Sequence, residues 1–412
     1  MNRARRWILC LVVLVMSAAP WTAVAEELAA EQQLNAYYTL MTLSLTSGDY
    51  EKALEYAQQC LSMDSILDDV LRADIYLKQG YALMYLYRFD EAIEALDESI
   101  AVSPDASDAM LLKMQTYAAQ SDAQAAMDQA DAYLEAYPDQ TEVYTTLGEI
   151  FAAGGDYASA IEAYDQYFAV SKAANPAAYQ MRGQYLLQLG RYDEAIADLT
   201  QAIEAGGEQA DVRAYYLRAI SRMQVTEYAA AMQDLDVCVA YLEEQEALAA
   251  SDPDFEPQID ADVLYSRYYR GIAGMQMAFY EQAIADFTAC VDTQVNAQYA
   301  QFWRGVCLLD SGSYDRALED FQACSENEVE VESCLYYTAL CHMGMGEYQT
   351  AVECFTQCID QGVMTSQSLY NRGMCYIQLG DTEKGQADLE QSVGDESPSE
   401  PVAEAELPDI SE

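Results

Sequence analysis

The chain has 412 residues, of which 20 are Lys or Arg and 69 are Asp or Glu, so its formal charge is −49, and 52% of its residues are hydrophobic. That apolar share is enough for a folded core, whereas the acidity, with no basic cluster beyond the first six residues, argues against binding to nucleic acid or to anionic membrane surfaces. The single histidine, His342, removes most catalytic arrangements that depend on an imidazole.

The first 25 residues are typical of an export signal. Three arginines fall within the first six residues, residues 7–16 are apolar, and Ala-Val-Ala at 23–25 offers a cleavage site between small residues. We therefore expect a mature chain that begins at Glu26 and lies outside the cytoplasm. The alternative is an uncleaved membrane anchor, because residues 7–25 are mostly apolar.

A repeat with a period near 34 residues runs through residues 26–392. A small residue, or Met in two copies, recurs once per copy, and Ala or Gly follows it twelve residues later. Ten copies are present, and their first positions, which we call the small-residue column, are Met41, Gly80, Met114, Gly148, Gly183, Ala219, Gly271, Gly305, Ala339 and Gly373. Between the two positions most copies have a turn such as Gly154-Gly155-Asp156-Tyr157. Apolar residues at helical spacing on both sides predict two antiparallel helices in each copy.

The period, the small-residue pair and the aromatic residue after the turn resemble the tetratricopeptide repeat over about residues 34–392. The resemblance implies an all-α fold, a right-handed α-solenoid of about ten helical hairpins. In the third copy, around Met114, both the Gly and the aromatic turn residue are missing, so the register is least defined there.

Five copies have an Arg directly before the small residue and an Asp sixteen residues later. In the ninth copy both are replaced together, by Thr338 and Cys354. This paired change predicts that the two side chains meet across the hairpin as a partly buried ion pair. The alternative is that these arginines contact a ligand. The five pairs are Arg182–Asp198, Arg218–Asp234, Arg270–Asp286, Arg304–Asp320 and Arg372–Asp388.

The repeat is interrupted near residues 61–72 and 243–262, and the second interruption is expected to be a longer helix followed by an acidic loop with prolines. Residues 393–412 are rich in acid, Pro and Ser and are expected to form a disordered tail.

Six of the eleven cysteines, Cys290, Cys307, Cys324, Cys341, Cys358 and Cys375, follow one another at intervals of 17 residues, half of the repeat. They fall on equivalent faces of successive helices, where Cys can serve as a small core residue. The alternatives are disulfides between neighbouring helices in an exported protein and, less well supported by the spacing, a metal site.

The first helices of a superhelix of hairpins line a concave groove in which peptides can lie. Three residues before the small-residue column, the sixth to tenth copies have an aromatic ring, and aliphatic or Met residues lie nearby. The alternative is that these rings pack inside the superhelix. The predicted partner-binding residues are Tyr216, Tyr268, Phe302, Tyr336, Tyr370, Ile272, Met275 and Met374.

These patterns together predict an exported scaffold that binds a protein or peptide through this groove, with a basic segment in the partner complementing its acidic charge. No catalytic site, cofactor or metal is expected. The alternatives are a structural spacer in a cell-envelope assembly and a disulfide- or thiol-bearing redox protein.

Overall fold

The computed structural model describes residues 28–103, 105–171, 175–252 and 255–394. In these residues all regular structure is helical. The expected export signal and residues 395–412 of the expected tail lie outside the described residues, and the last helix extends to Gly394. The chain divides into two compact units, residues 1–173 and 174–412. The repeat pattern gave no sign of a division at that point.

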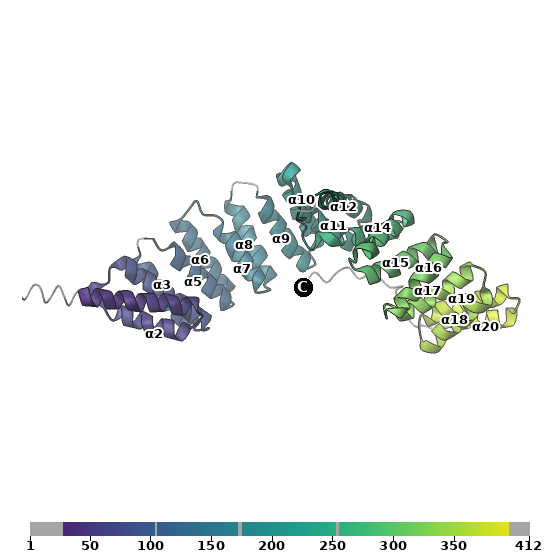
Figure 1. The fold of residues 1–412 in the computed structure, drawn as a ribbon, viewed down its shortest axis with the longest axis horizontal. Helices are drawn as coiled ribbons and strands as arrows, with labels where there is room; N and C mark the ends of the chain where they lie inside the picture. Colours follow the sequence, from purple (N-terminus) through teal and green to yellow (C-terminus); the bar gives the residue numbers. More distant parts are fainter. Residues whose placement is uncertain (1–27, 104, 172–174, 253–254, 395–412) are drawn as a thin grey trace, which may run out of the picture. The chain divides into compact units, whose positions relative to one another are not determined.

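The described part of the first unit forms four helical hairpins. The first pairs a helix over residues 28–46 with α2, and a 3-10 turn (Asp64–Ile66) precedes the second. Figure 1 shows the helices following one another in pairs along the chain. The helices are α2 (Tyr50–Leu61), α3 (Asp69–Tyr85), α4 (Phe89–Val102), α5 (Ser107–Ala119), α6 (Ala123–Ala136), α7 (Val143–Ala153) and α8 (Tyr157–Val170).

Six hairpins make up the second unit as far as its residues are described. Its helix α12 has 24 residues, as expected for the first part of the interruption near 243–262. The second helices of the other hairpins of both units have 12 to 15 residues. The helices are α9 (Pro176–Gln188), α10 (Tyr192–Gly206), α11 (Val212–Gln224), α12 (Tyr228–Ser251), α13 (Ser266–Gln276), α14 (Tyr280–Thr293), α15 (Ala297–Asp310), α16 (Tyr314–Glu326), α17 (Val331–Gly344), α18 (Tyr348–Gln361), α19 (Thr365–Gln378) and α20 (Thr382–Gly394).

Each hairpin turn contains one residue in the left-handed conformation. Glycine supplies it in six hairpins, for example Gly312 at φ +79°, where the N–H groups of Gly312 and Ser313 close the end of α15 by hydrogen bonds of 2.9 and 2.7 Å. In the third hairpin Ser121 takes the same conformation at φ +63°. The hairpin therefore forms there without the glycine, and Met114 and its partner Ala126 are both buried as the repeat register requires.

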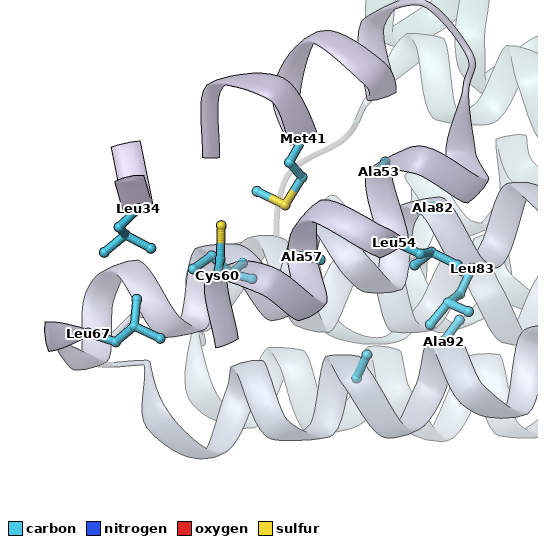
Figure 2. Packing of buried hydrophobic residues seen from close by; sticks show 12 residues of the cluster. Leu34, Met41, Ala53, Leu54, Ala57, Cys60, Leu67, Ala82, Leu83 and Ala92 are labelled. Atoms are coloured by element: carbon cyan, nitrogen blue, oxygen red, sulfur yellow. The ribbon is translucent and has the colours of Figure 1, made fainter. Parts of the chain in front are cut away.

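The small-residue column lets the two helices of a hairpin approach closely. A Cβ atom added at Gly305 would lie 2.8 Å from the Phe321 ring, and one at Gly148 would lie 2.6 Å from the Tyr164 ring. In the first hairpin, Met41 and Ala53 belong to one core with Ala57 and Cys60 (Figure 2). Close helix packing around small side chains is thus the common feature of the repeats.

The five predicted Arg–Asp ion pairs are present, each across its own hairpin. In the pair of Arg304 and Asp320, Nε donates to Oδ2 at 2.8 Å and Nη2 to Oδ1 at 2.6 Å, and the other four pairs have the same bidentate geometry. The carboxylates are buried; Asp320 is 4% exposed. The hydrogen bond with Asp320 raises the pKa of Arg304. The arginines are therefore structural, which favours the first of the two interpretations.

Several of these arginines also bind the preceding hairpin, a contact that the sequence pattern did not indicate. Nη1 of Arg304 donates to Oγ1 of Thr288 in α14 at 3.3 Å, and Nη1 of Arg372 donates to Oγ1 of Thr356 in α18 at 3.1 Å. In Arg270 the corresponding acceptor is the carboxylate of Asp236 in α12. One guanidinium thus fixes the register of a hairpin and its stacking on the one before it.

In the structure the cysteines occupy small core positions, as the first of the three interpretations predicts, and none of the described ones is in a disulfide. The ten in the described residues are free thiols, and all of them are buried except Cys354, which is half-buried. Burial raises the pKa of Cys307 and of Cys341 to about 12. These side chains act as small core residues.

Candidate functional site

The candidate binding surface of the second unit lies on the first helices of its hairpins. Positions six and three residues before the small-residue column, and one and four after it, share one side of a helix because they are spaced by three or four residues. We call this the first-helix face. On α13 and the turn before it, the face consists of Tyr265, Tyr268, Ile272 and Met275.

The structure places most of the predicted groove residues in the core. Tyr216, Tyr268, Phe302, Tyr336 and Ile272 are at most 6% exposed. Tyr370 is 51% exposed, and Met275 and Met374 are half-buried. The prediction of a series of accessible aromatic rings is therefore corrected: of the five predicted rings, Tyr370 is the one exposed to solvent.

The buried rings are covered by the hairpin that follows. Phe302 of α15 packs against Phe321 of its own hairpin and against Tyr337 of α17, with ring centroids 6.1 and 5.7 Å apart. Tyr216 meets Tyr269 of the next hairpin in the same way, with ring centroids 6.1 Å apart. In both cases the covering residue lies two positions before the small-residue column position of the next hairpin.

The first helices of the last two hairpins, α17 and α19, show why Tyr370 differs. In α19 the covering position is occupied by Asn371, whose Nδ2 donates to the Tyr336 hydroxyl at 3.0 Å. Burial raises the pKa of Tyr336, as expected for an enclosed phenol. Within the described residues no hairpin follows α20, so nothing covers Tyr370.

Two further tyrosines are open on the first-helix face. Tyr265 and Tyr299, each six residues before the small-residue column, are 40% and 47% exposed. The sequence signal that marks them is an aromatic residue at that position in two consecutive copies. Together with Tyr370 they form the accessible aromatic set, and Met275 and Met374 lie on the same face.

The basic residue of this face is already neutralised. Arg213 of α11 donates to Oδ2 of Asp262 through Nε and Nη2, at 3.0 and 2.8 Å, and lies 3.6 Å from Oδ2 of Asp260. The accessible side chains of the face are therefore aromatic and apolar. Arg213 is already paired and is not available to bind a carboxylate of a partner.

The first unit has a separate, acidic hollow of about 620 Å³ between α2, α3 and α4. Arg88, the one basic residue among those lining it, is hydrogen-bonded to Glu91. Such a surface favours cationic groups. Its acidic residues are Glu51, Glu55, Glu91, Glu94, Asp97 and Glu98.

The described residues offer neither a cluster of metal ligands nor a membrane-spanning helix. No group of three or more His, Cys, Asp or Glu is placed to hold a metal ion. None of the helices described is both long and apolar enough to cross a membrane.

Several solved structures are similar to parts of this chain. A MamA protein structure is 23% identical, with 43% of this chain and 93% of that chain covered and a TM-score of 0.33. A tetratricopeptide repeat protein from Parabacteroides merdae ATCC 43184 is 15% identical, covering 67% and 99%, with a TM-score of 0.35. The TPR domain of P58(IPK) is 13% identical, covering 90% and 95%, with a TM-score of 0.31. No curated protein matches the chain.

Family models give the assignment directly. Three models described as tetratricopeptide repeat match residues 34–66, 77–141, 176–205, 270–324, 333–361 and 366–394. These segments together make up more than half of the chain, and they overlap hairpins of both units. The protein belongs to the tetratricopeptide repeat family.

Proposed function

We propose that this protein is a non-catalytic scaffold that binds a protein or peptide on the first-helix face of its second unit. The observation that carries the proposal is the accessible aromatic set, Tyr265, Tyr299 and Tyr370, each at least 40% exposed on the face that stacked hairpins turn toward ligands. Tyrosine contributes a large rigid surface and a polar hydroxyl, which is why it is enriched at interfaces.

The partner we propose has apolar or aromatic side chains for this face and basic groups elsewhere. The formal charge of −49 favours association with a basic protein, chiefly by raising the rate of encounter. The acidic hollow between α2, α3 and α4 supports a basic partner, because its six carboxylates outnumber the single basic residue, Arg88.

We further propose that the scaffold works outside the cytoplasm, after removal of the first 25 residues. The support is the basic start, apolar stretch and Ala-Val-Ala site of the sequence. Fractionation of cells that express the tagged chain, with sequencing of the mature N-terminus, tests this part. A first residue of Glu26 in the extracytoplasmic fraction would support it, and an intact Met1 would refute cleavage.

Binding is tested by affinity capture from the extracytoplasmic fraction with residues 26–412 as bait. The test variant changes Tyr265, Tyr299 and Tyr370 to Ser. All three side chains are well exposed, so the fold should be retained, and circular dichroism checks this. Replacing the buried Tyr268, Phe302 or Tyr336 would instead disrupt the core and give no information on binding.

A matched control variant removes exposed apolar groups away from the face. Leu43, Val237 and Leu248 are 40–58% exposed, and all three are changed to Ser. The proposal expects one partner to be retained by the wild type and the control and lost by the tyrosine variant. Equal capture by all three would refute binding through this face and would favour a spacer role.

A further inference from the structure

Three connections in the second unit have the same backbone geometry. They follow α14, α16 and α18, and in each the carbonyl oxygen of a cysteine near the helix end accepts from the N–H of a valine five residues later. The distances are 3.0 Å for Cys290 and Val295, 2.9 Å for Cys324 and Val329, and 2.8 Å for Cys358 and Val363. The residues on either side of each valine are left-handed. Side chains at equivalent positions therefore point in equivalent directions.

The residue ten positions after each cysteine lies in the first turn of the next helix and is fully buried. These residues are Ala300, Cys334 and Ser368, each at 0% exposure. The Ser368 hydroxyl donates to the Val363 carbonyl at 3.1 Å, and the Cys334 thiol donates to the Val329 carbonyl at 3.6 Å. Cys334 thus takes the place and the direction that Ser368 has in the next hairpin.

This position touches the cysteine of the preceding helix. The Ser368 hydroxyl contacts the Cys358 thiol, and Ser266 contacts Cys238 at the connection after α12. Between α16 and α17 the same contact joins two thiols, those of Cys324 and Cys334. Among the described residues, this is the junction at which both partners are cysteine.

We propose that Cys324 and Cys334 are a dithiol pair that oxidises to a disulfide joining α16 to α17. The oxidant is a disulfide compound such as oxidised glutathione. One of the two cysteines, as a thiolate, attacks one donor sulfur, forms a mixed disulfide and releases the first donor thiolate. The other thiol then loses its proton and attacks the cysteine sulfur of the mixed disulfide, which releases the second donor thiolate. Two electrons and two protons pass from the cysteines to the donor.

The contact between the two thiols lowers the pKa of Cys334, whereas the same contact and burial raise the pKa of Cys324. Deprotonation of either thiol leaves a thiolate in contact with the other sulfur.

The oxidant reaches the pair when the connection opens locally. Cys324 lies in the last turn of α16, Cys334 in the first turn of α17, and the residues between include exposed Glu328 and Glu330. Helix ends and exposed connections open at much lower free energy than the whole fold. This proposal does not depend on the partner-binding function.

The test uses the reduced mature chain, residues 26–412, incubated with oxidised glutathione under native conditions. The protein is then denatured, alkylated and digested with a glutamate-specific protease, because Glu326 to Glu332 separate the two cysteines. Mass spectrometry should find one disulfide, between Cys324 and Cys334, with the other eight thiols alkylated. The intact oxidised chain should be lighter by two hydrogens.

Two variants provide controls. Cys334→Ser copies the residue at Ser368, so it should fold normally and form no intrachain disulfide. Ser368→Cys should add a second disulfide, with Cys358, because it copies the proposed pair at the next junction. A parallel denatured sample shows that the oxidant is active.

Three outcomes would overturn the proposal. One is a native wild-type chain that keeps ten free thiols while the denatured sample is oxidised. Another is a set of disulfides that includes Cys290 or Cys307 as often as Cys334. The third is accumulation of a glutathione adduct on either cysteine of the pair, because the other thiol would then have failed to attack it.

Discussion

The ion pair between Arg304 and Asp320 gives the sharpest test of how the hairpins are held together, because the chain contains its own replacement for the pair. In the ninth hairpin the same two positions are Thr338 and Cys354. We therefore compare Asp320→Cys, Arg304→Thr and the double variant Arg304→Thr/Asp320→Cys, all in reducing buffer.

The magnitude follows from the geometry of the pair. Removing Asp320 leaves a guanidinium that is 17% exposed in the side chain and retains its hydrogen bond to Thr288 at 3.3 Å. Breaking a buried pair typically costs about 3–5 kcal/mol. Because Arg304 keeps some solvent and the threonine, we expect the lower limit, about 3 kcal/mol, for Asp320→Cys. Arg304→Thr should cost a similar amount, because it leaves the Asp320 carboxylate buried.

The double variant leaves no unpaired charge. We expect it to be about 1–2 kcal/mol less stable than the wild type, although the two single losses would add to about 6 kcal/mol. A coupling of several kcal/mol would establish that the two side chains act as one unit.

Urea unfolding of residues 26–412 measures these values. Trp303 precedes Arg304, and because Trp7 and Trp21 precede Glu26 it is the sole tryptophan of residues 26–412. It is 5% exposed, so its fluorescence reports unfolding of the hairpin that contains the pair, while circular dichroism reports the whole array. A double variant within about 0.5 kcal/mol of the summed single losses would refute the reasoning.

Three further predictions follow from packing and burial. Phe302→Ala should destabilise the protein by about 3–5 kcal/mol in the same urea assay, because the ring is fully buried, whereas Tyr370→Ala should change stability by less than about 0.5 kcal/mol; equal effects would contradict the assigned burial. Gly148→Ala should destabilise by about 1–3 kcal/mol, despite the better helix propensity of Ala, because its Cβ would lie 2.6 Å from the buried Tyr164 ring; an unchanged midpoint would contradict this packing. Burial raises the pKa of Cys307 from 9.0 to about 12, so the thiol ionises at lower pH in the unfolded chain than in the folded one. The contribution of this thiol to the free energy of unfolding should therefore be complete below pH 9 and decrease between pH 9 and about 12. The Cys307→Ala variant should show a smaller decrease over that pH range.

Much of the fold could be predicted from the repeat pattern, because local sequence determines where helices and turns form. The small-residue column, the turn residues and the Arg–Asp spacing all recur within one hairpin, so each can be recognised in about 34 residues of sequence. The third hairpin shows the strength of this local information. It forms in register around Met114 and Ala126 although its turn has Ser121 in place of glycine.

The candidate site could be predicted only in part, because exposure depends on contacts between hairpins. Tyr216 and Tyr370 are the same residue type at the same repeat position, yet the first is 4% exposed and the second 51%. The difference comes from Tyr269, which covers Tyr216 from the next hairpin, while nothing in the described residues covers Tyr370. Helical periodicity could not distinguish these two tyrosines.

The sequence by itself thus determined the hairpins, their number and the ion pairs inside them, since these depend on residues close together in the chain. Only the tertiary structure decided which aromatic rings face solvent and which two of the ten described cysteines touch, Cys324 and Cys334. The physical reason is that stacking one hairpin on the next removes surface from both. Which side chains remain accessible is therefore set by neighbours that the repeat pattern does not specify.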